Sequence, residues 1–133
     1  MLAYVSRLIA FAFILTLTGC ASGPTAQQIA AADYGSPVDQ EQAEAQVKLY
    51  FKGVLKDPYS AHYQFGRAYR GYVVGSAFEG RQLSAGYLLD TQVNAKNSYG
   101  GYTGYKSYRF LFQSGALVKG YEMSPSGLIM PIF

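Results

Sequence analysis

Residues 86–97 read Gly-Tyr-Leu-Leu-Asp-Thr-Gln-Val-Asn-Ala-Lys-Asn, and this stretch decides the expected fold. In a β-strand, every second side chain points to the same face, so a regular alternation over this length predicts a strand. One face would carry Tyr87, Leu89, Thr91, Val93 and Ala95, and the other face Leu88, Asp90, Gln92, Asn94 and Lys96.

Further strands are expected on both sides of this one. Downstream, Tyr105 to Gln113 alternates in the same way, with one face formed by Tyr108, Phe110 and Phe112 and the other by Ser107, Arg109 and Gln113. Ser114-Gly115 predicts a tight turn into a final strand, Ala116 to Met123, with one side formed by Leu117, Tyr121 and Met123. Upstream, Tyr63 to Val74 is typical of one or two strands, although its two glycines weaken the pattern.

An amphipathic helix is expected before the strands. Ser36 is placed as its N-cap and Pro37 as its first residue, and Asp57-Pro58 would end it because proline disfavours helix at the preceding residue. One apolar stripe follows the helical spacing and consists of Ala43, Val47, Tyr50, Phe51, Val54 and Leu55. Residues 37–133 are therefore expected to form one small α+β domain, with one N-terminal helix packed on roughly three to five antiparallel strands.

A second stripe on this helix consists of lysines. Lys48, Lys52 and Lys56 repeat every four residues, on a face apart from the apolar stripe. Such a stripe is compatible with binding to nucleic acid or to a membrane surface, but a solvated helix face is the simpler interpretation and is favoured.

The first 36 residues differ in character from the rest. Residues 8–18 form an apolar segment shorter than the roughly 20 residues that a membrane-spanning helix needs, and within the roughly 7–15 of a signal-peptide core. Residues 1–19 are therefore expected to be a cleaved signal peptide. Residues 20–36 contain few large apolar side chains and are expected to be a flexible linker, within which Ala and Gln residues would allow a short helix over Thr25 to Ala32.

Cys20 is the only cysteine in the chain and directly follows the apolar segment. The run Leu17-Thr18-Gly19-Cys20 resembles the lipobox of bacterial lipoproteins, which implies cleavage before Cys20 and a covalent diacylglyceryl group on its thiol. In that class an aspartate after the cysteine favours the inner membrane. Ala21 at that position implies the outer membrane, with the protein facing the periplasm. The alternative, a secretory peptide followed by an incidental free thiol, is less favoured because an odd cysteine is a liability in an oxidising compartment.

Signatures of catalysis are scarce. A pairing of Ser60 with the single histidine, His62, would put both side chains on one face of an extended segment, without the angle that a nucleophile and its base require. One histidine, one cysteine and scattered carboxylates also leave too few ligands for a metal. We expect no catalytic residues, no metal, and no cofactor beyond the covalent lipid on Cys20.

The segment from Asn94 to Lys106 is the most unusual part of the chain. Its asparagines and glycines suit a plain strand-to-strand loop. A plain hairpin does not need so many tyrosines and lysines, however, and tyrosine combines a flat apolar area with a polar tip at low entropy cost, as binding surfaces require. The candidate binding residues are Asn94, Lys96, Asn97, Tyr99, Tyr102, Tyr105 and Lys106.

Two segments carry a wider resemblance. Residues 56–61, Lys-Asp-Pro-Tyr-Ser-Ala, and residues 94–104, Asn-Ala-Lys-Asn-Ser-Tyr-Gly-Gly-Tyr-Thr-Gly, are similar to a pattern in a family of small bacterial envelope proteins, many of them lipoproteins. The resemblance covers about residues 47–118. It implies a fold and a location in the cell envelope, but no assigned activity.

The function expected from these observations is a non-enzymatic, lipid-anchored binding module of the cell envelope. Its partners would be the membrane, through the lipid, and an envelope protein or peptidoglycan. The formal net charge is +3 and falls to about +2 once Arg7 is removed with the signal peptide. This charge mildly favours acidic partners but is too small to indicate nucleic-acid binding. The alternative is an inhibitor or exclusion factor that plugs an envelope enzyme or receptor. A hydrolase of envelope polymers is less favoured still.

Changing Cys20→Ser tests the lipidation. The substitution removes the thiol that accepts the lipid, so we expect an unprocessed precursor that incorporates no labelled fatty acid. Gel mobility and metabolic labelling with palmitate measure both effects. Normal processing and membrane partitioning of the variant would contradict the lipoprotein interpretation.

Overall fold

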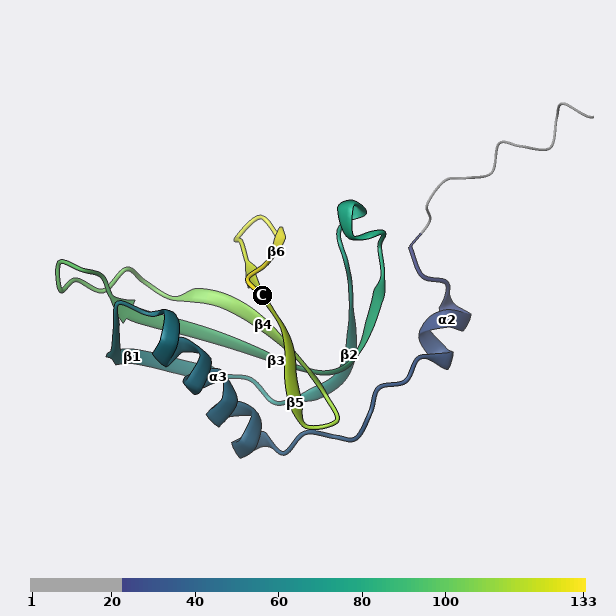
Figure 1. Cartoon of the computed structure of the whole chain (residues 1–133). Helices are drawn as coiled ribbons and strands as arrows, with labels where there is room; N and C mark the ends of the chain where they lie inside the picture. Colours follow the sequence, from purple (N-terminus) through teal and green to yellow (C-terminus); the bar gives the residue numbers. More distant parts are fainter. Residues whose placement is uncertain (1–22) are drawn as a thin grey trace, which may run out of the picture.

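The computed structural model describes residues 23–133, which form short helices packed on an antiparallel sheet (Figure 1). The expected α+β fold is therefore confirmed. In chain order the elements are α2 (Ala26–Ala31), α3 (Gln40–Val54), β1 (Asp57–Phe65), β2 (Tyr69–Val74), the 3-10 turn η1 (Ala77–Glu79), β3 (Leu83–Lys96), β4 (Lys106–Gln113), β5 (Ala116–Met123) and β6 (Ile129–Pro131). No helix in this described part is long and apolar enough to cross a membrane. The predicted signal peptide and Cys20 lie outside the described residues.

Strand β3 organises the sheet. Its 14 residues pair with β4 along one edge, while the other edge is shared by β1 and β2. The predicted strand at residues 86–97 is confirmed, but it begins three residues earlier and ends one residue earlier, at Lys96. The segment predicted as one or two strands forms two, separated by Gly66 to Ala68. The sheet order is β1-β3-β4-β5-β6 with β2 beside β3, so six strands replace the three to five expected.

Helix α3 covers one face of the sheet and closes the main core. Its buried residues are Ala43, Val47 and Phe51, and they pack against Leu89, Val93, Tyr108, Phe110 and Phe112. The ring of Phe51 meets those of Tyr108 and Phe110 edge-on, with centroids 4.9 and 5.8 Å apart. The predicted apolar faces of the helix and of β3 and β4 are thus the buried ones. Val54, expected in the stripe, is an exception and stays 54% exposed, because the helix ends there and Leu55 packs on the core instead.

Both predicted ends of the helix require correction. The N-cap is Asp39, whose carboxylate accepts a hydrogen bond from the Gln42 amide at 3.1 Å, and not Ser36. Pro37 precedes the helix, and Val38 is buried in the core. At the other end, the helix stops at Val54 and Asp57-Pro58 already begins β1. Asp39 is also a preferred N-cap residue, and it caps the helix three residues after Ser36.

A β-bulge in β5 changes which side chains of this strand share a face. The pairing of β4 with β5 shifts between Leu111 and Phe112, which oppose Lys119 and Leu117, so Val118 is an extra residue. A bulge of this kind reverses the side-chain alternation beyond it. Leu117 therefore packs on the core under α3, whereas Tyr121 is buried on the opposite face with Val73, Leu88 and Leu111. The prediction that Leu117 and Tyr121 share a face is wrong.

Residues 23–36, within the predicted linker, include the short helix α2, which Thr25 caps. Two contacts join this segment to the sheet. The Arg70 guanidinium lies 3.8 Å from the centre of the Tyr34 ring, and the Gln113 side chain donates to the Asp33 carbonyl at 3.4 Å. The end of the linker at residue 36 stays a prediction, and these contacts show that the residues just before it touch the domain.

Two glutamine side chains attach α3 to the sheet. Gln40 donates to the Gly66 carbonyl at 3.0 Å and accepts from the Ala68 amide at 2.8 Å. Gln46 donates to the Gly115 carbonyl at 2.8 Å and accepts from the Leu117 amide at 2.9 Å. Each side-chain amide thus satisfies two backbone groups at or beside a strand connection, which sets the position of the helix along the sheet.

Replacing Gln46→Ala should destabilise the domain. It leaves the Gly115 carbonyl of the β4–β5 turn and the Leu117 amide of β5 without their side-chain partner, which costs about 1–3 kcal/mol of unfolding free energy. Denaturant unfolding measures the loss, with Gln42→Ala, an exposed glutamine of the same helix, as control. Equal, small effects of the two changes would contradict the role assigned to Gln46.

Candidate functional site

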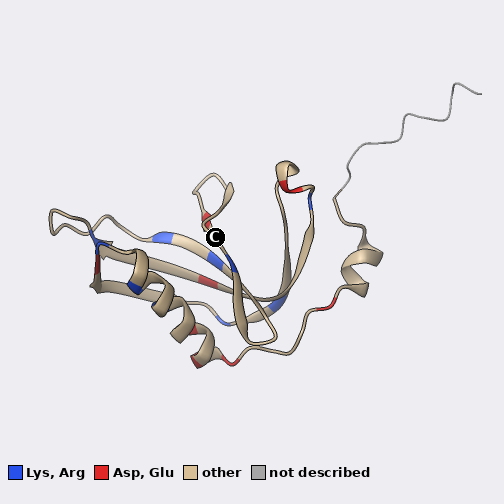
Figure 2. Ribbon diagram, viewed as in Figure 1, with Lys and Arg blue, Asp and Glu red and all other residues tan. Residues whose placement is uncertain are grey.

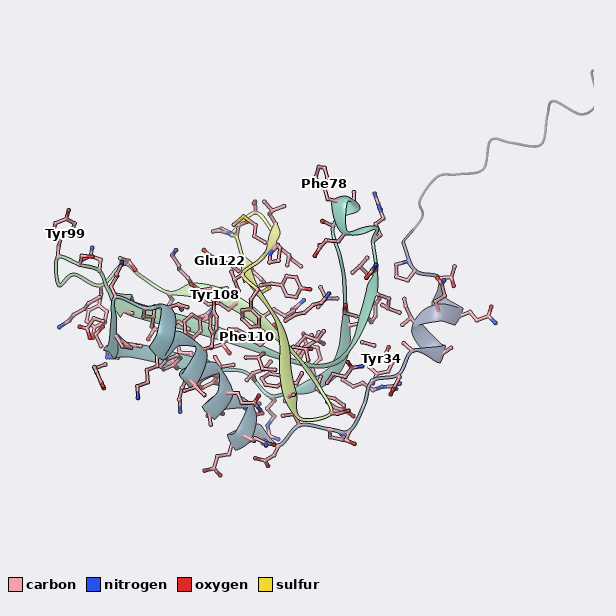
Figure 3. The ribbon with its side chains drawn as sticks, viewed as in Figure 1. Tyr34, Phe78, Tyr99, Tyr108, Phe110 and Glu122 are labelled. Carbon is pink, nitrogen blue, oxygen red and sulfur yellow. The ribbon has the colours of Figure 1, made fainter. Side chains whose placement is uncertain are left out.

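The seven candidate residues lie at one end of the sheet. Asn94 and Lys96 are among the last three residues of β3, and Lys106 is the first residue of β4. The other four lie in the connecting loop. The loop projects from the end of the domain opposite α2 (Figure 1), and Figure 3 shows Tyr99 at its tip. Residues 94–106 are named the tyrosine loop below.

Two asparagine side chains hold the tyrosine loop in shape. The Asn97 side-chain oxygen accepts from the amides of Tyr99 at 2.9 Å and Gly101 at 3.1 Å, and the Asn97 amide donates to the Gly101 carbonyl at 2.8 Å. The Asn94 side-chain oxygen accepts from the Gly104 amide at 3.0 Å. Gly104 has φ +92°, a conformation that favours glycine. The oxygens of both asparagines are thus engaged inside the loop.

The tyrosine loop is also docked on β1. The Tyr102 hydroxyl donates to the Ser60 carbonyl at 3.1 Å and lies 3.3 Å from Nε2 of His62. The His62 and Tyr102 rings have centroids 5.1 Å apart, and the Lys96 ammonium lies 5.5 Å from the centre of the Tyr102 ring. The loop therefore rests on a strand more than thirty residues away in sequence.

Ser60 joins the two segments on which the family resemblance rests. Its hydroxyl donates to the Asp57 carbonyl at 2.8 Å and accepts from the Lys96 amide at 2.9 Å. Residues 56–61 and 94–104 thus form one structural unit. The proton of the Ser60 hydroxyl is donated to a backbone carbonyl and not to the His62 ring.

The three tyrosines of the loop differ in exposure. Tyr99 is 96% exposed, whereas Tyr102 and Tyr105 are each 46% exposed. The Tyr102 ring is partly covered because it packs beside His62. Tyr59, on β1 beside Ser60, is 90% exposed and was missed by the sequence reasoning. An exposed aromatic residue in a strand alternation gives no signal that distinguishes it from an ordinary edge residue.

A small hollow lies beneath the base of the tyrosine loop, and we name it the lysine hollow. It measures about 190 Å³ and is lined by Lys56, Lys96 and Lys106 together with Asn97, Thr103, Tyr108 and apolar residues of α3 and β3. Figure 2 shows the basic residues at this end of the sheet. Three of the predicted candidates, Lys96, Asn97 and Lys106, are thus brought together.

Lys56 is the residue of this hollow that the sequence reasoning missed. Its spacing in the sequence places it with Lys48 and Lys52 in a solvated helix stripe. Because the helix ends at Val54, Lys56 leaves the helical repeat and turns toward β3 instead. The lysine at the end of the stripe therefore belongs to a different surface from the other two.

A larger hollow shares Lys106 with the first. It measures about 680 Å³ and is lined by Tyr105, Lys106, Arg109 and Glu122 among others. Its charges are paired: Lys106 lies 3.5 Å from Glu122, and Arg109 makes two hydrogen bonds of 2.7 and 2.9 Å to Asp90. Lys106 lines both hollows, while Tyr108 and Arg109, from opposite faces of β4, each line one of them.

Tyr108 forms the floor of the lysine hollow. Burial raises the pKa of its hydroxyl to about 12, and the negative charges of Glu122 and of an ionised Tyr50 add to this effect. The residue is 8% exposed, which agrees with burial as the main cause.

No group of three potential metal ligands occurs within residues 23–133.

Comparison with known proteins leaves the fold and this site as the only basis for assignment. No protein-family model, no curated protein and no solved structure matches the chain. The resemblance to small envelope lipoproteins stays a prediction. The fold defines a single-sheet α+β protein with a loop that is anchored at both its base and its side.

Stability at high pH tests the burial of Tyr108. The folded-state pKa of about 12 exceeds the ordinary 10.0, so the unfolded chain loses this proton first and stability falls as the pH rises from 10 toward 12. In Tyr108→Phe this contribution is absent, and the decline should be shallower. Urea unfolding at several pH values measures the slopes. Equal slopes for the two proteins would show that the hydroxyl is solvated in the folded state.

Proposed function

We propose that this protein is a non-enzymatic, lipid-anchored module of the cell envelope that binds an envelope component or a protein partner through the tyrosine loop. The observation that carries the proposal is a loop held in one shape by its own side chains while Tyr99 is 96% exposed. A monomer gains nothing in stability from an aromatic ring in water. A binding surface gains a large contact area from it.

The hydrogen bonds of the loop support this proposal through entropy. Binding costs free energy when a flexible segment must be ordered, and a loop that is already ordered avoids that cost. Asn97, Asn94 and Tyr102 restrain the loop at its tip, its base and its side. The backbone that carries Tyr99 is therefore already ordered before a partner binds.

The position of the loop supports a partner beyond the membrane. A lipid on Cys20 would be joined to the domain through the segment that contains α2, and the tyrosine loop lies at the opposite end of the domain (Figure 1). The loop would then point away from the anchoring bilayer. This arrangement fits an outer-membrane protein that faces the periplasm and contacts a component some distance from its own lipid.

An inhibitor or exclusion factor is the second candidate, and the protrusion of Tyr99 favours it (Figure 3). A single exposed ring at the tip of a rigid loop suits insertion into a cleft. This function requires one tight protein partner. Binding to an envelope polymer instead requires retention on isolated cell wall, so the two candidates are separated by the same capture experiment.

Capture from cells tests the proposed function. The full chain carries an affinity tag and is extracted in mild detergent, and wild type is compared with Tyr99→Ala and Tyr102→Ala. We expect a contact residue to cost more than about 1 kcal/mol, or roughly fivefold in the amount captured. Phe78→Ala is the control, because Phe78 is equally exposed but lies at the tip of the β2–β3 hairpin (Figure 3).

Two results would contradict the proposal. Indifference of every captured component to Tyr99→Ala and Tyr102→Ala would remove the loop from the binding surface. A loss of equal size in Phe78→Ala would show that any exposed aromatic residue has the same effect, so the capture would be non-specific.

A further inference from the structure

We propose that the tip of the β2–β3 hairpin inserts the Phe78 ring into the phospholipid bilayer that carries the lipid on Cys20. The hairpin tip comprises residues 75–82 and contains the 3-10 turn η1. This inference rests on the lipid anchor of the proposed function, which supplies the bilayer. It adds a second membrane contact, made by the folded domain itself.

The apolar character of the hairpin tip is the first observation. Phe78 is fully exposed at the end of the hairpin (Figure 3). Val74 and Tyr72 follow at alternate positions of β2, so they share a face, and they are 37% and 40% exposed. Unlike Tyr99, Phe78 has no polar group with which to meet a hydrated partner. Its ring therefore fits the apolar side of a lipid interface better.

The short reach of the anchor is the second observation. α2 lies at the same end of the sheet as the hairpin (Figure 1), and its Gln28 lines one hollow with Leu83 to Ala85 of β3. The described residues begin at Gly23, three residues after Cys20, so the lipid attachment lies within about 11 Å of Gly23. The anchoring bilayer is therefore held near the hairpin end of the domain.

A nearby anchor makes a weak insertion sufficient. Full burial of a phenylalanine side chain shifts an equilibrium by roughly tenfold or more, which is too little to hold a free protein on a membrane. Once a covalent lipid has brought the hairpin to the surface, insertion becomes an intramolecular step at a high effective concentration. We therefore expect the inserted state to predominate.

The backbone of the hairpin tip is prepared for an apolar environment, where an unpaired amide or carbonyl is costly. The Ser76 amide donates to the Glu79 carboxylate at 2.8 Å, and the Arg81 amide donates to the Ser76 carbonyl at 3.0 Å. The amides of Gly75 and Gly80 donate to carbonyls within the same tip at 2.9 and 3.2 Å. These four amides thus need no water as a partner.

The charges of the hairpin tip limit the depth of insertion. Glu79 and Arg81 follow Phe78 closely and carry opposite charges (Figure 2). The apolar stem of Arg81 allows its guanidinium to stay among the headgroups while the Phe78 ring lies deeper. The contact is therefore interfacial, with only the ring reaching the edge of the hydrocarbon.

Tryptophan fluorescence tests the insertion, because the chain contains no tryptophan. The full chain carrying Phe78→Trp is purified as the lipoprotein and reconstituted into phosphatidylethanolamine–phosphatidylglycerol vesicles, with and without brominated acyl chains. We expect the brominated lipid to lower the emission about twofold or more, since the inserted state predominates. Tyr99→Trp is the matched control, because Tyr99 is also almost fully exposed but lies at the opposite end of the domain, and its emission should not change.

Crosslinking in intact cells identifies what covers the hairpin tip, independently of the tryptophan variant. A photoreactive benzophenone analogue in place of Phe78 should capture phospholipid. Capture of a protein instead, a second copy of this chain included, would assign the tip to a protein interface and overturn the inference.

Two fluorescence results would also overturn the inference: no quenching of Phe78→Trp, or equal quenching of Phe78→Trp and Tyr99→Trp. Absent quenching with a labelled lipid on Cys20 and tyrosine-dependent capture intact would overturn this inference alone. Quenching of Phe78→Trp without tyrosine-dependent capture would overturn only the binding role of the tyrosine loop.

Discussion

The hydrogen-bonded edges of β3 are the constraint on which the rest of the structure depends. One edge pairs with β4 from Tyr87 to Val93, and the other is divided between β2 and β1. Leu89 and Val93 on one face close the core under α3, while Leu88 on the other face joins a second apolar cluster. A single strand thus serves three strand pairings and both clusters, and loss of its register would expose both faces at once.

The candidate site is an extension of the same strand. Asn94 and Lys96 belong to β3, so the strand that orders the sheet also positions the base of the tyrosine loop. Asn94 bonds back to Gly104, and the Lys96 amide bonds to Ser60 on β1. The loop is therefore continuous with the most extensively paired element of the sheet, which explains how a protruding segment keeps a defined shape without being buried.

Much of this fold could be predicted from sequence because its strands alternate regularly. The Ser114-Gly115 turn and the strand that follows it were predicted to the residue. The bulge at Val118 could not be predicted, since only the pairing with β4 creates it, and so Leu117 was assigned to the wrong face. Lys56 was misplaced because a regular lysine spacing concealed the end of the helix. The contact of Tyr102 with Ser60 depends on the β1–β3 register, which no local pattern contains.

The central claim is that the tyrosine loop is an ordered binding surface and not a mobile connection. Backbone ¹⁵N relaxation of the full chain in detergent tests this most directly, at the amides of Tyr99, Gly101 and Gly104. The structure predicts order parameters near those of β3, about 0.85, because Asn97 and Asn94 hold these three amides. Values below about 0.6 at the same amides would contradict the account.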